Sequence, residues 1–517
     1  MKKQLKKLMA FAVITSTVLS FNVVPIAANN GTPERVIGKT GFFGGITEGR
    51  ELPNTTDILM QDNGRRTQTT TENFTYRRVV FINGISTEIE GLLRITTRGG
   101  VTDAPFGTYR VTHHISSPNG NAAGDRITSN LDLDVHWRRD GNQIVRNFSV
   151  RSWSEVIRVN GQNYTLRPNQ SHFSVSSLED VRPGATYFRG TVNVQAVYFN
   201  ANRPITIISE GHIYGFNTVW SNAESNIMTT TIMRDDWQMQ VETRSSVSVN
   251  KTLQFTPTQP TYISFAGNYV EIMQNRSFLT YDVIVYPQHF SGMPTRGTAY
   301  IRAFNRHEHL VSRDTSVWRG HFAEANINQL FAMDILRGDP RFFVPGDAIT
   351  RSEFVQMLVR SIKLPLVPVP TQTGTARNPV QINIVFPDVM HDRPDFPYVM
   401  AAYNARLALG RGNGHFEPDS RLTREEVITL MVRALGLTNL GSGVITPFSD
   451  NYYISPWAME SVDAAVRLGL VAPDSYGYIH PQQIVTKAEA AAWIVRFIEY
   501  MRHDLQADYT EHLLFFF

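Results

Sequence analysis

Thr350-Arg-Ser-Glu353, Thr423-Arg-Glu-Glu426 and Thr486-Lys-Ala-Glu489 are three copies of one short pattern in the last third of a 517-residue chain. Thr-x-x-Glu ahead of an apolar run predicts a capping box at the start of a helix. In that motif the threonine hydroxyl accepts from a first-turn amide, and the glutamate carboxylate accepts from the threonine amide. We therefore expect three helices that begin at these threonines, with Glu353, Glu426 and Glu489 as capping residues.

The residues around each copy also repeat. A proline precedes each threonine by five positions, and the apolar residues after each glutamate occupy the same columns. These columns form a single stripe on an α-helix, so each helix buries one face. The prolines are Pro345, Pro418 and Pro481; the apolar columns are Phe354, Val355, Leu358, Val359 and Ile362, then Val427, Ile428, Met431, Val432 and Leu435, then Ala490, Ala491, Ile494, Val495 and Ile498. Such a pattern is an internal repeat.

A second helical stretch precedes each copy, and it is clearest at Trp457–Leu470. Each unit therefore reads as helix, loop, helix, and three units can close one shared core. Alignment on this stretch places the following residues in two columns, an aromatic one and a turn: Phe322, Phe396 and Trp457, then Gly338, Gly412 and Pro473.

This combination resembles the S-layer homology domain in its usual triple arrangement. The resemblance implies a pseudo-threefold α-helical bundle that attaches an exported protein non-covalently to secondary cell-wall polysaccharide, an acidic polymer that often carries ketal-linked pyruvate. It covers residues 315–502. The expected segments are repeats at 315–364, 385–440 and 446–503, a Pro-rich linker at 365–384, and a tail at 504–517.

A helix start offers unsatisfied amides and the positive end of the helix dipole, which favour an anion. The residue after each capping threonine is Arg351, Arg424 or Lys487, and a guanidinium can hold a carboxylate with two hydrogen bonds. We therefore predict a glycan-binding site with aromatic rings packed on sugars. In the alternative, purely structural interpretation, these residues only cap helices or face solvent. The predicted ligand-binding residues are Thr350, Arg351, Phe396, Phe416, Thr423, Arg424, Trp457, Thr486 and Lys487.

The amino terminus predicts export. Met1–Lys7 holds four lysines, Leu8–Val24 is largely apolar, and Pro25–Ala28 ends in small residues, so 1–28 reads as a signal peptide. Loss of those lysines takes the formal charge from +3 to −1 (3 − 4), which does not suggest nucleic acid as a partner. Cysteine is absent, so disulfides are excluded. We expect a secreted bacterial protein at the cell wall or cell surface, with no retained transmembrane helix.

Residues 29–314 have a different texture. Short alternating runs are separated by Asn83-Gly84, Asp140-Gly141 and Asn160-Gly161, and such pairs indicate β-hairpins. We expect an antiparallel all-β region, a sandwich or a barrel, either as one module or as two subdomains divided near 165–185. We find no family resemblance in it.

Three groups of acidic residues in the β region were weighed for chemistry. Asp132, Asp134 and His136 alternate along one strand and could hold a divalent metal, although a solvated polar face is the plainer reading. Asp235-Asp236 could supply half of a glycosidase carboxylate pair or simply mark a turn. Glu88 and Glu90 share a strand face as Asp132 and Asp134 do, and a solvated polar face is the plainer reading for them as well. We assign no metal, no cofactor and no catalytic residue.

These observations favour a wall-anchored surface protein that displays a β-rich binding or structural module. A wall-tethered polysaccharide hydrolase is the alternative, and two carboxylates about 5–10 Å apart would favour it. Self-assembly into a surface layer is a third reading.

Overall fold

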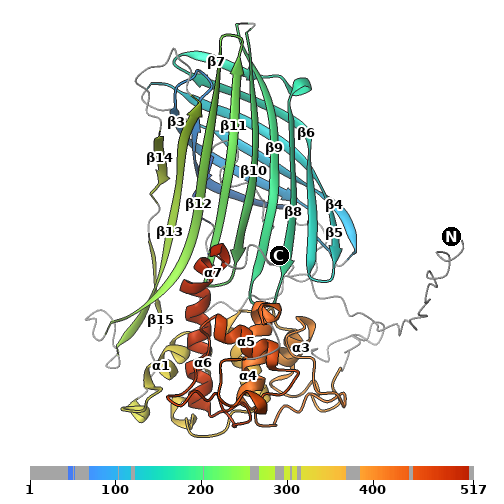
Figure 1. Cartoon of the computed structure of the whole chain (residues 1–517), viewed down its shortest axis with the longest axis vertical. Coiled ribbons are helices and arrows are strands. Elements are labelled where there is room, and N and C mark those ends of the chain that lie inside the picture. The colour runs from blue at the N-terminus through green and yellow to red at the C-terminus, as the bar shows by residue number, and fades with distance from the viewer. Residues whose placement is uncertain are drawn as a thin grey trace, which may run out of the picture.

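The computed structural model describes most of the chain beyond the predicted signal peptide, which lies outside the described residues together with most of the Pro-rich linker and the Phe-rich carboxyl end. The described residues are 45–49, 52, 69–102, 104–117, 123–201, 203–256, 267–285, 296–302, 305–310, 316–367, 385–441 and 446–511. They form two parts, a tall antiparallel sheet and a compact helical body beneath it (Figure 1).

The amino-terminal part is one 15-stranded antiparallel sheet, whose strands mostly pair with their neighbours in the chain. The strands are β1 Gly45–Thr47, β2 Thr69–Val80, β3 Thr87–Arg98, β4 Phe106–Ser116, β5 Arg126–Asp140, β6 Gln143–Val159, β7 Gln162–Leu166, β8 His172–Val181, β9 Thr186–Asn200, β10 Arg203–Asn217, β11 Ser221–Arg234, β12 Trp237–Thr256, β13 Asn268–Val285, β14 Arg296–Ile301 and β15 Arg306–Leu310. Because β8 pairs with both β6 and β9, the sheet continues without a break across residues 165–185.

Alternation along each strand explains why these residues form a sheet with one apolar face. In β5, Leu131, Leu133 and Val135 are buried while the residues between them are more exposed. The hairpin predictions hold at the turns. Asn160 and Gly161 both have positive φ (51° and 75°), the backbone that a two-residue hairpin turn requires.

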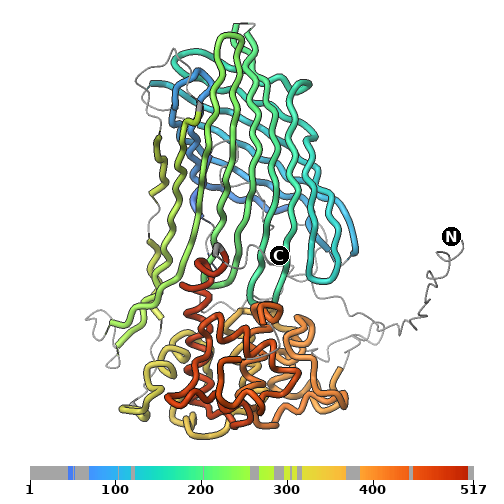
Figure 2. Tube along the Cα trace, viewed as in Figure 1, coloured from blue at the N-terminus to red at the C-terminus, as the bar shows by residue number. Residues whose placement is uncertain are grey.

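The sheet rolls up until its two ends meet, with the first strands crossing behind the later ones (Figure 2). Side chains close this contact. The Asn275 amide oxygen accepts from the Gly49 amide at 3.1 Å, and Tyr281 packs edge-on against Phe81 at 5.1 Å. Apolar side chains from both ends of the sheet share the interior core. Of the predicted sandwich and barrel, the structure has the barrel; we call this part the rolled sheet.

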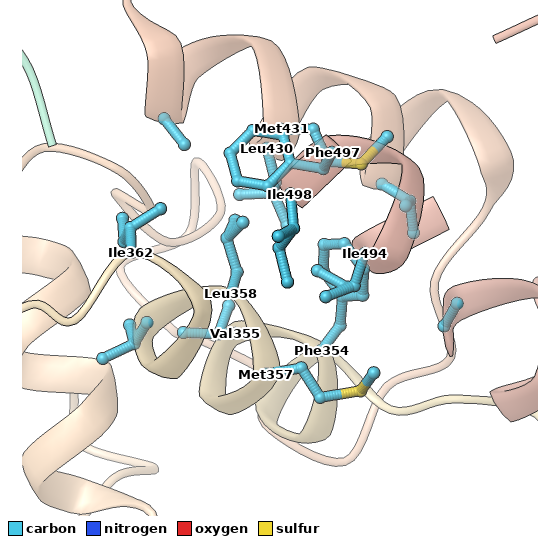
Figure 3. Packing of buried hydrophobic residues seen from close by; sticks show 14 of the residues in the cluster. Phe354, Val355, Met357, Leu358, Ile362, Leu430, Met431, Ile494, Phe497 and Ile498 are labelled. Atoms are coloured by element: carbon cyan, nitrogen blue, oxygen red, sulfur yellow. The ribbon is translucent and has the colours of Figure 1, made fainter. Parts of the chain in front are cut away.

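The helical body consists of three helix–loop–helix units. Unit one is α1 Glu324–Ala332 and α2 Arg351–Ser361; unit two is α3 Phe396–Asn404 and α4 Arg424–Leu435; unit three is α5 Met459–Arg467 and α6 Lys487–Glu499. Short 3-10 turns precede or connect these helices: η3 Ser316–Trp318, η4 Pro340–Phe342, η5 Thr438–Leu440 and η6 Asn451–Tyr453. The repeated apolar columns of α2, α4 and α6 meet in one core, with Leu358, Met431 and Ile494 among its members (Figure 3).

The predicted alignment of the first helices was wrong by two residues in unit two. Each first helix ends at a residue with left-handed backbone, and these are Asp334, Arg406 and Gly469, with φ of 57°, 56° and 61°. The residue twelve positions before each of these left-handed residues should occupy one column of the alignment. These residues are Phe322 (334 − 12), Pro394 (406 − 12) and Trp457 (469 − 12), so the aligned residue of unit two is Pro394 and not Phe396. The sequence did not reveal this alignment because a left-handed backbone is usual for glycine and rare for an arginine such as Arg406.

The two parts share one core at the base of the rolled sheet. Trp220 and Tyr187 from the sheet belong to the same buried cluster as α2, α4 and α6. The Trp220 indole N–H donates to the Ser361 carbonyl at 2.8 Å, and the Tyr187 hydroxyl donates to the Leu435 carbonyl at 3.1 Å. The rolled sheet is therefore packed directly on the helical body.

The carboxyl-terminal helix strengthens this contact. After α6, a π-helical turn (η7, Tyr500–Asp504) leads into α7, Leu505–Glu511, which rises against the rolled sheet (Figure 1). Tyr509 stacks on Tyr187 at 5.8 Å, and its hydroxyl donates to the Phe188 carbonyl at 2.9 Å. The buried Arg502 guanidinium lies 4.6 Å from the centre of the Trp220 ring. The described part of the tail thus packs against the sheet.

Candidate functional site

The three units interlock in a ring at the starts of α2, α4 and α6. The first two amides of each helix donate to carbonyls in the loop of the next unit, and the second carbonyl of each pair belongs to a repeated proline. The bonds are Arg351 to Ser420 (2.8 Å) and Ser352 to Pro418 (2.9 Å), Arg424 to Gln483 (2.9 Å) and Glu425 to Pro481 (3.1 Å), and Lys487 to Asp347 (2.8 Å) and Ala488 to Pro345 (2.9 Å). The repeated proline therefore marks where one unit receives the next.

The predicted capping boxes are present at all three helix starts. The capping carboxylates accept from the threonine amides, at 3.0 Å for Thr350 and Thr423 and 2.9 Å for Thr486. Together with the interlock, this occupies the amides that the sequence left open for an anion. The prediction that free helix amides would bind the ligand is therefore wrong, and any anion site must rest on side chains.

Each of these three helix starts lies against the neighbouring unit, and we call the three contact regions junctions. The first junction lies where α2 begins against unit two, the second where α4 begins against unit three, and the third where α6 begins against unit one. At the second junction, Arg424 Nη2 pairs with Glu489 Oε1 at 2.7 Å. At the third, Lys487 Nζ pairs with Glu353 Oε1 at 2.7 Å. In both, the cation is neutralised by the capping glutamate of the neighbouring unit.

The first junction breaks this pattern. The equivalent glutamate, Glu426, is held instead by Arg411 of unit two, with Nη2 and Oε1 2.8 Å apart. Arg351 has no carboxylate partner among the described residues, although it is only 8% exposed and its Nε has no hydrogen-bond partner there. Its guanidinium lies over the Phe416 ring at 5.1 Å. Burial lowers the pKa of Arg351, and the nearby Arg411 and Arg433 act in the same direction against the opposing effect of Glu426.

Arg433 adds a third guanidinium to the first junction. Its counterparts serve their own units: Arg360 donates to the Ile335 carbonyl at 3.1 Å, and Arg496 donates to the Gly469 carbonyl at 2.9 Å. Arg433 forms no hydrogen bond or ion pair with any residue in the described ranges, and burial lowers its pKa. The first junction therefore concentrates positive charge that the other two do not have.

The structure separates the predicted aromatic residues. Phe396 and Phe416 lie in the core, at 2% and 0% exposure, so the prediction that they pack on sugar rings is wrong. The Phe416 ring instead packs against the Arg351 guanidinium at the first junction. Trp457 is half-exposed and can meet a ligand.

The acidic residues that the sequence singled out in the rolled sheet are not buried, and they contact neighbouring side chains. Asp132 accepts from the hydroxyls of Thr112 at 2.6 Å and Ser152 at 2.9 Å, and Asp134 pairs with Arg110 at 3.3 Å. Within the described ranges, no group of three or more His, Cys, Asp or Glu side chains is arranged to hold a metal ion.

The other two acidic groups also have nearby cations. Glu88 pairs with Arg77 at 2.5 Å, and Arg77 also contacts Glu90. Asp235 and Asp236 form the turn between β11 and β12, where Arg234 binds Asp236. The plainer readings, a solvated polar face and a turn, describe these residues.

Two of the three interlocked units match a known family, the S-layer homology domain. The model of that family matches residues 386–428 and 447–491, which lie in units two and three. With these domains, the chain is a secreted protein of the cell surface, associated with the cell wall. No helix in the described part of the chain is both long and apolar enough to cross a membrane.

Three relatives indicate the range of proteins that share such a segment. An endoglucanase of Bacillus sp. (strain KSM-635) is 27% identical over 191 residues, 34% of this chain and 18% of that protein. Exoglucanase XynX of Acetivibrio thermocellus is 28% identical over 163 residues, 30% of this chain and 13% of its own. An S-layer protein of Bacillus thuringiensis subsp. finitimus is 28% identical over 180 residues, 34% of this chain and 20% of its own. The similarity thus spans a fifth or less of each relative.

Proposed function

We propose that the helical body is a wall anchor of three S-layer homology units, unit one included, that binds acidic secondary cell-wall polysaccharide. Unit one lies outside the family match, but it has the same capping box and the same interlock as the other two. We assign the acidic substituent of the polymer, pyruvate or a similar carboxylate, to the first junction. The single observation that carries this assignment is the buried Arg351 without a carboxylate partner among the described residues.

The energetics support this assignment. A buried cation without a partner is costly, so a ligand carboxylate would restore the charge balance that Glu426 gives up to Arg411. A guanidinium also suits a carboxylate better than a lysine does, because it donates two parallel hydrogen bonds. The second and third junctions hold their own carboxylates, so Arg424 and Lys487 are secondary candidates.

For the rolled sheet we propose a display role, as a binding or structural module. Its inner face is lined mainly by apolar side chains such as Leu131 and Val135, and two carboxylates buried in the sheet are paired with arginines, Glu155 with Arg78 at 2.9 Å and Glu179 with Arg146. The acidic groups weighed on its outer face have cations or hydroxyls beside them. A wall-tethered hydrolase stays the alternative because two relatives are glucanases. Self-assembly into a layer is a further candidate, since other relatives are S-layer proteins.

The test is binding of the full chain to purified cell-wall sacculi, with and without the polysaccharide stripped off. We compare Arg351→Gln with Arg424→Gln, a matched control one unit further on. Since hydrogen bonds to charged groups contribute roughly 1.5–3 kcal/mol, Arg351→Gln should weaken binding by at least tenfold and Arg424→Gln by much less. Equal loss in both variants, or binding that ignores the polysaccharide, contradicts the proposal.

A further inference from the structure

Unit three carries a group of large aromatic side chains that the anion site does not use. Tyr452, Tyr453, Trp457, Tyr476 and Tyr478 are 96%, 70%, 53%, 80% and 40% exposed, and we call them the aromatic platform. They come from two short segments, 452–457 and 476–478. Scattered exposed apolar residues are ordinary, but a local concentration of exposed aromatic rings marks an interaction surface.

The segment 476–478 is a tight turn held by hydrogen bonds. The Asp474 carboxylate accepts from the amides of Tyr476 and Tyr478, both at 2.9 Å, and Gly477 supplies the positive φ of 84°. The Tyr478 ring also stacks on His480, with centroids 5.6 Å apart. The backbone of this turn and the Tyr478 ring are therefore held in place before any ligand arrives, which lowers the entropy cost of binding.

The segment 452–457 is held alongside this turn. Asp450 accepts from the amides of Ile479 at 3.1 Å and His480 at 2.7 Å. Further along, the Gln482 side-chain amide donates to the Tyr453 carbonyl at 3.0 Å. The two segments therefore present their rings from one region of unit three.

The charge of this region separates it from the first junction. The Arg424 guanidinium donates to the Ile479 carbonyl at 2.9 Å, so the platform borders the second junction. There Arg424 is already paired with Glu489. A carboxylate on a ligand would find no free cation at this pair, whereas an uncharged ligand has no charge to balance.

We propose that the aromatic platform is a second carbohydrate-binding surface, which stacks on the apolar faces of neutral sugar rings. This inference rests on the proposed function, because the sugars belong to the same wall polymer whose acidic group binds at the first junction. All five members are aromatic, and each has a hydroxyl or indole N–H at its edge that can meet a sugar hydroxyl. That composition fits a glycan better than an aliphatic protein partner.

The test uses the full chain and two probes, the purified wall polysaccharide and the same polysaccharide with its carboxylates amidated, measured by titration calorimetry. The key variant is Tyr476→Asn with Tyr478→His, because Asn413 and His415 occupy these places in the equivalent turn of unit two and preserve its geometry. Phe342→Ser, at an exposed aromatic of unit one, is the matched control.

We expect the amidated polymer to bind the parent chain, Arg351→Gln and Phe342→Ser alike, and to bind the double tyrosine variant about tenfold more weakly or not at all. The inference is overturned if the double tyrosine variant binds the amidated polymer as tightly as the parent chain does. It is also overturned if the variant differs from the parent only in self-association, measured by sedimentation. Binding of the native polymer alone overturns the inference and leaves the proposed function standing. Binding of neither polymer overturns both.

Discussion

The turn of unit two and the turn of unit three have one backbone and opposite chemistry. Gly414 and Gly477 have φ of 80° and 84°, and the left-handed residues that follow, Glu417 and His480, have φ of 58° and 55°. Three residues before each glycine the charge has the opposite sign, because unit two has Arg411 where unit three has Asp474. Arg411 pairs with Glu417 in unit two, at 2.9 Å, where Asp474 lies 3.0 Å from His480 in unit three.

This exchange decides what each junction can bind. An arginine in the turn takes the capping glutamate away from the neighbouring helix start, and Arg351 is left without it. An aspartate in the same place cannot pair with the glutamate, which stays on Arg424. A repeated scaffold thus gains distinct sites by changing one turn residue, while glycine and left-handed backbone keep the shape constant.

The largest effect should come from giving unit two the turn chemistry of unit three. In the double variant Arg411→Asp, Glu417→His, we expect Glu426 to be released to Arg351, so that the first junction becomes neutral. Binding of the native wall polysaccharide should fall by about tenfold to a hundredfold, because charge-assisted hydrogen bonds to the ligand are lost. Titration calorimetry on the full chain measures this.

Two controls accompany this variant. Its thermal unfolding should stay close to that of the parent, since both turns exist in one protein. Arg421→Gln removes an arginine of the same loop that forms none of the contacts described above and should leave affinity unchanged. Undiminished binding by the double variant would show that the cation at position 411 does not control the site.

The reverse change should have a smaller effect of opposite sign. With Asp474→Arg, the new guanidinium can draw Glu489 away from Arg424 and create a second acid-binding junction. We expect affinity for the native polymer to rise several-fold, less than the loss above, because removal of Asp474 also loosens the Tyr476 and Tyr478 amides. The stoichiometry measured by calorimetry distinguishes a new binding site from tighter binding at the first junction. An unchanged affinity would show that the charge of this turn residue does not control binding at the second junction.

The sequence predicted the parts of this molecule that depend on local chemistry. Three Thr-x-x-Glu patterns gave three capped helices, and Asn160-Gly161 gave a hairpin turn, because cap and turn preferences act over a few residues. The closure of the rolled sheet could not be predicted, since Asn275 meets Gly49 across most of the sheet. Nor could the packing of Trp220 on Ser361, which joins two parts that differ in composition.

The candidate site was predicted only halfway. Arg351 was named from its place after the cap, but the free helix amides expected beside it are bonded to unit two. Arg411 was missed because its importance lies in holding Glu426 of its own unit away from Arg351 of unit one. The one signal in the sequence for the role of Arg411 was its opposite charge to Asp474, the equivalent residue of unit three. That difference can be seen only when units two and three are aligned correctly, with Arg406 as the left-handed residue after the first helix of unit two.

The smallest expected effect concerns pH and the pair that neutralises the second junction. Burial acts to raise the pKa of Glu489, but hydrogen bonds from Thr486 and the nearby Arg424 outweigh it and hold the pKa below its ordinary 4.5. A lowered pKa in the folded state means that the carboxylate stabilises the fold above pH 4.5, and that this stabilisation is lost as the pH falls through the lowered value.

The Glu489→Gln variant should remove that part of the pH dependence. Because the pair is partly exposed and screened by solvent, the difference in unfolding free energy should be roughly 0.5–1 kcal/mol at neutral pH and should vanish in acid. Urea unfolding of both chains across pH 3–7 measures it. At neutral pH the variant should also bind the native polymer more tightly, since Arg424 would then resemble Arg351. Tighter binding without any change in stability would mean that the pair blocks a ligand without supporting the fold.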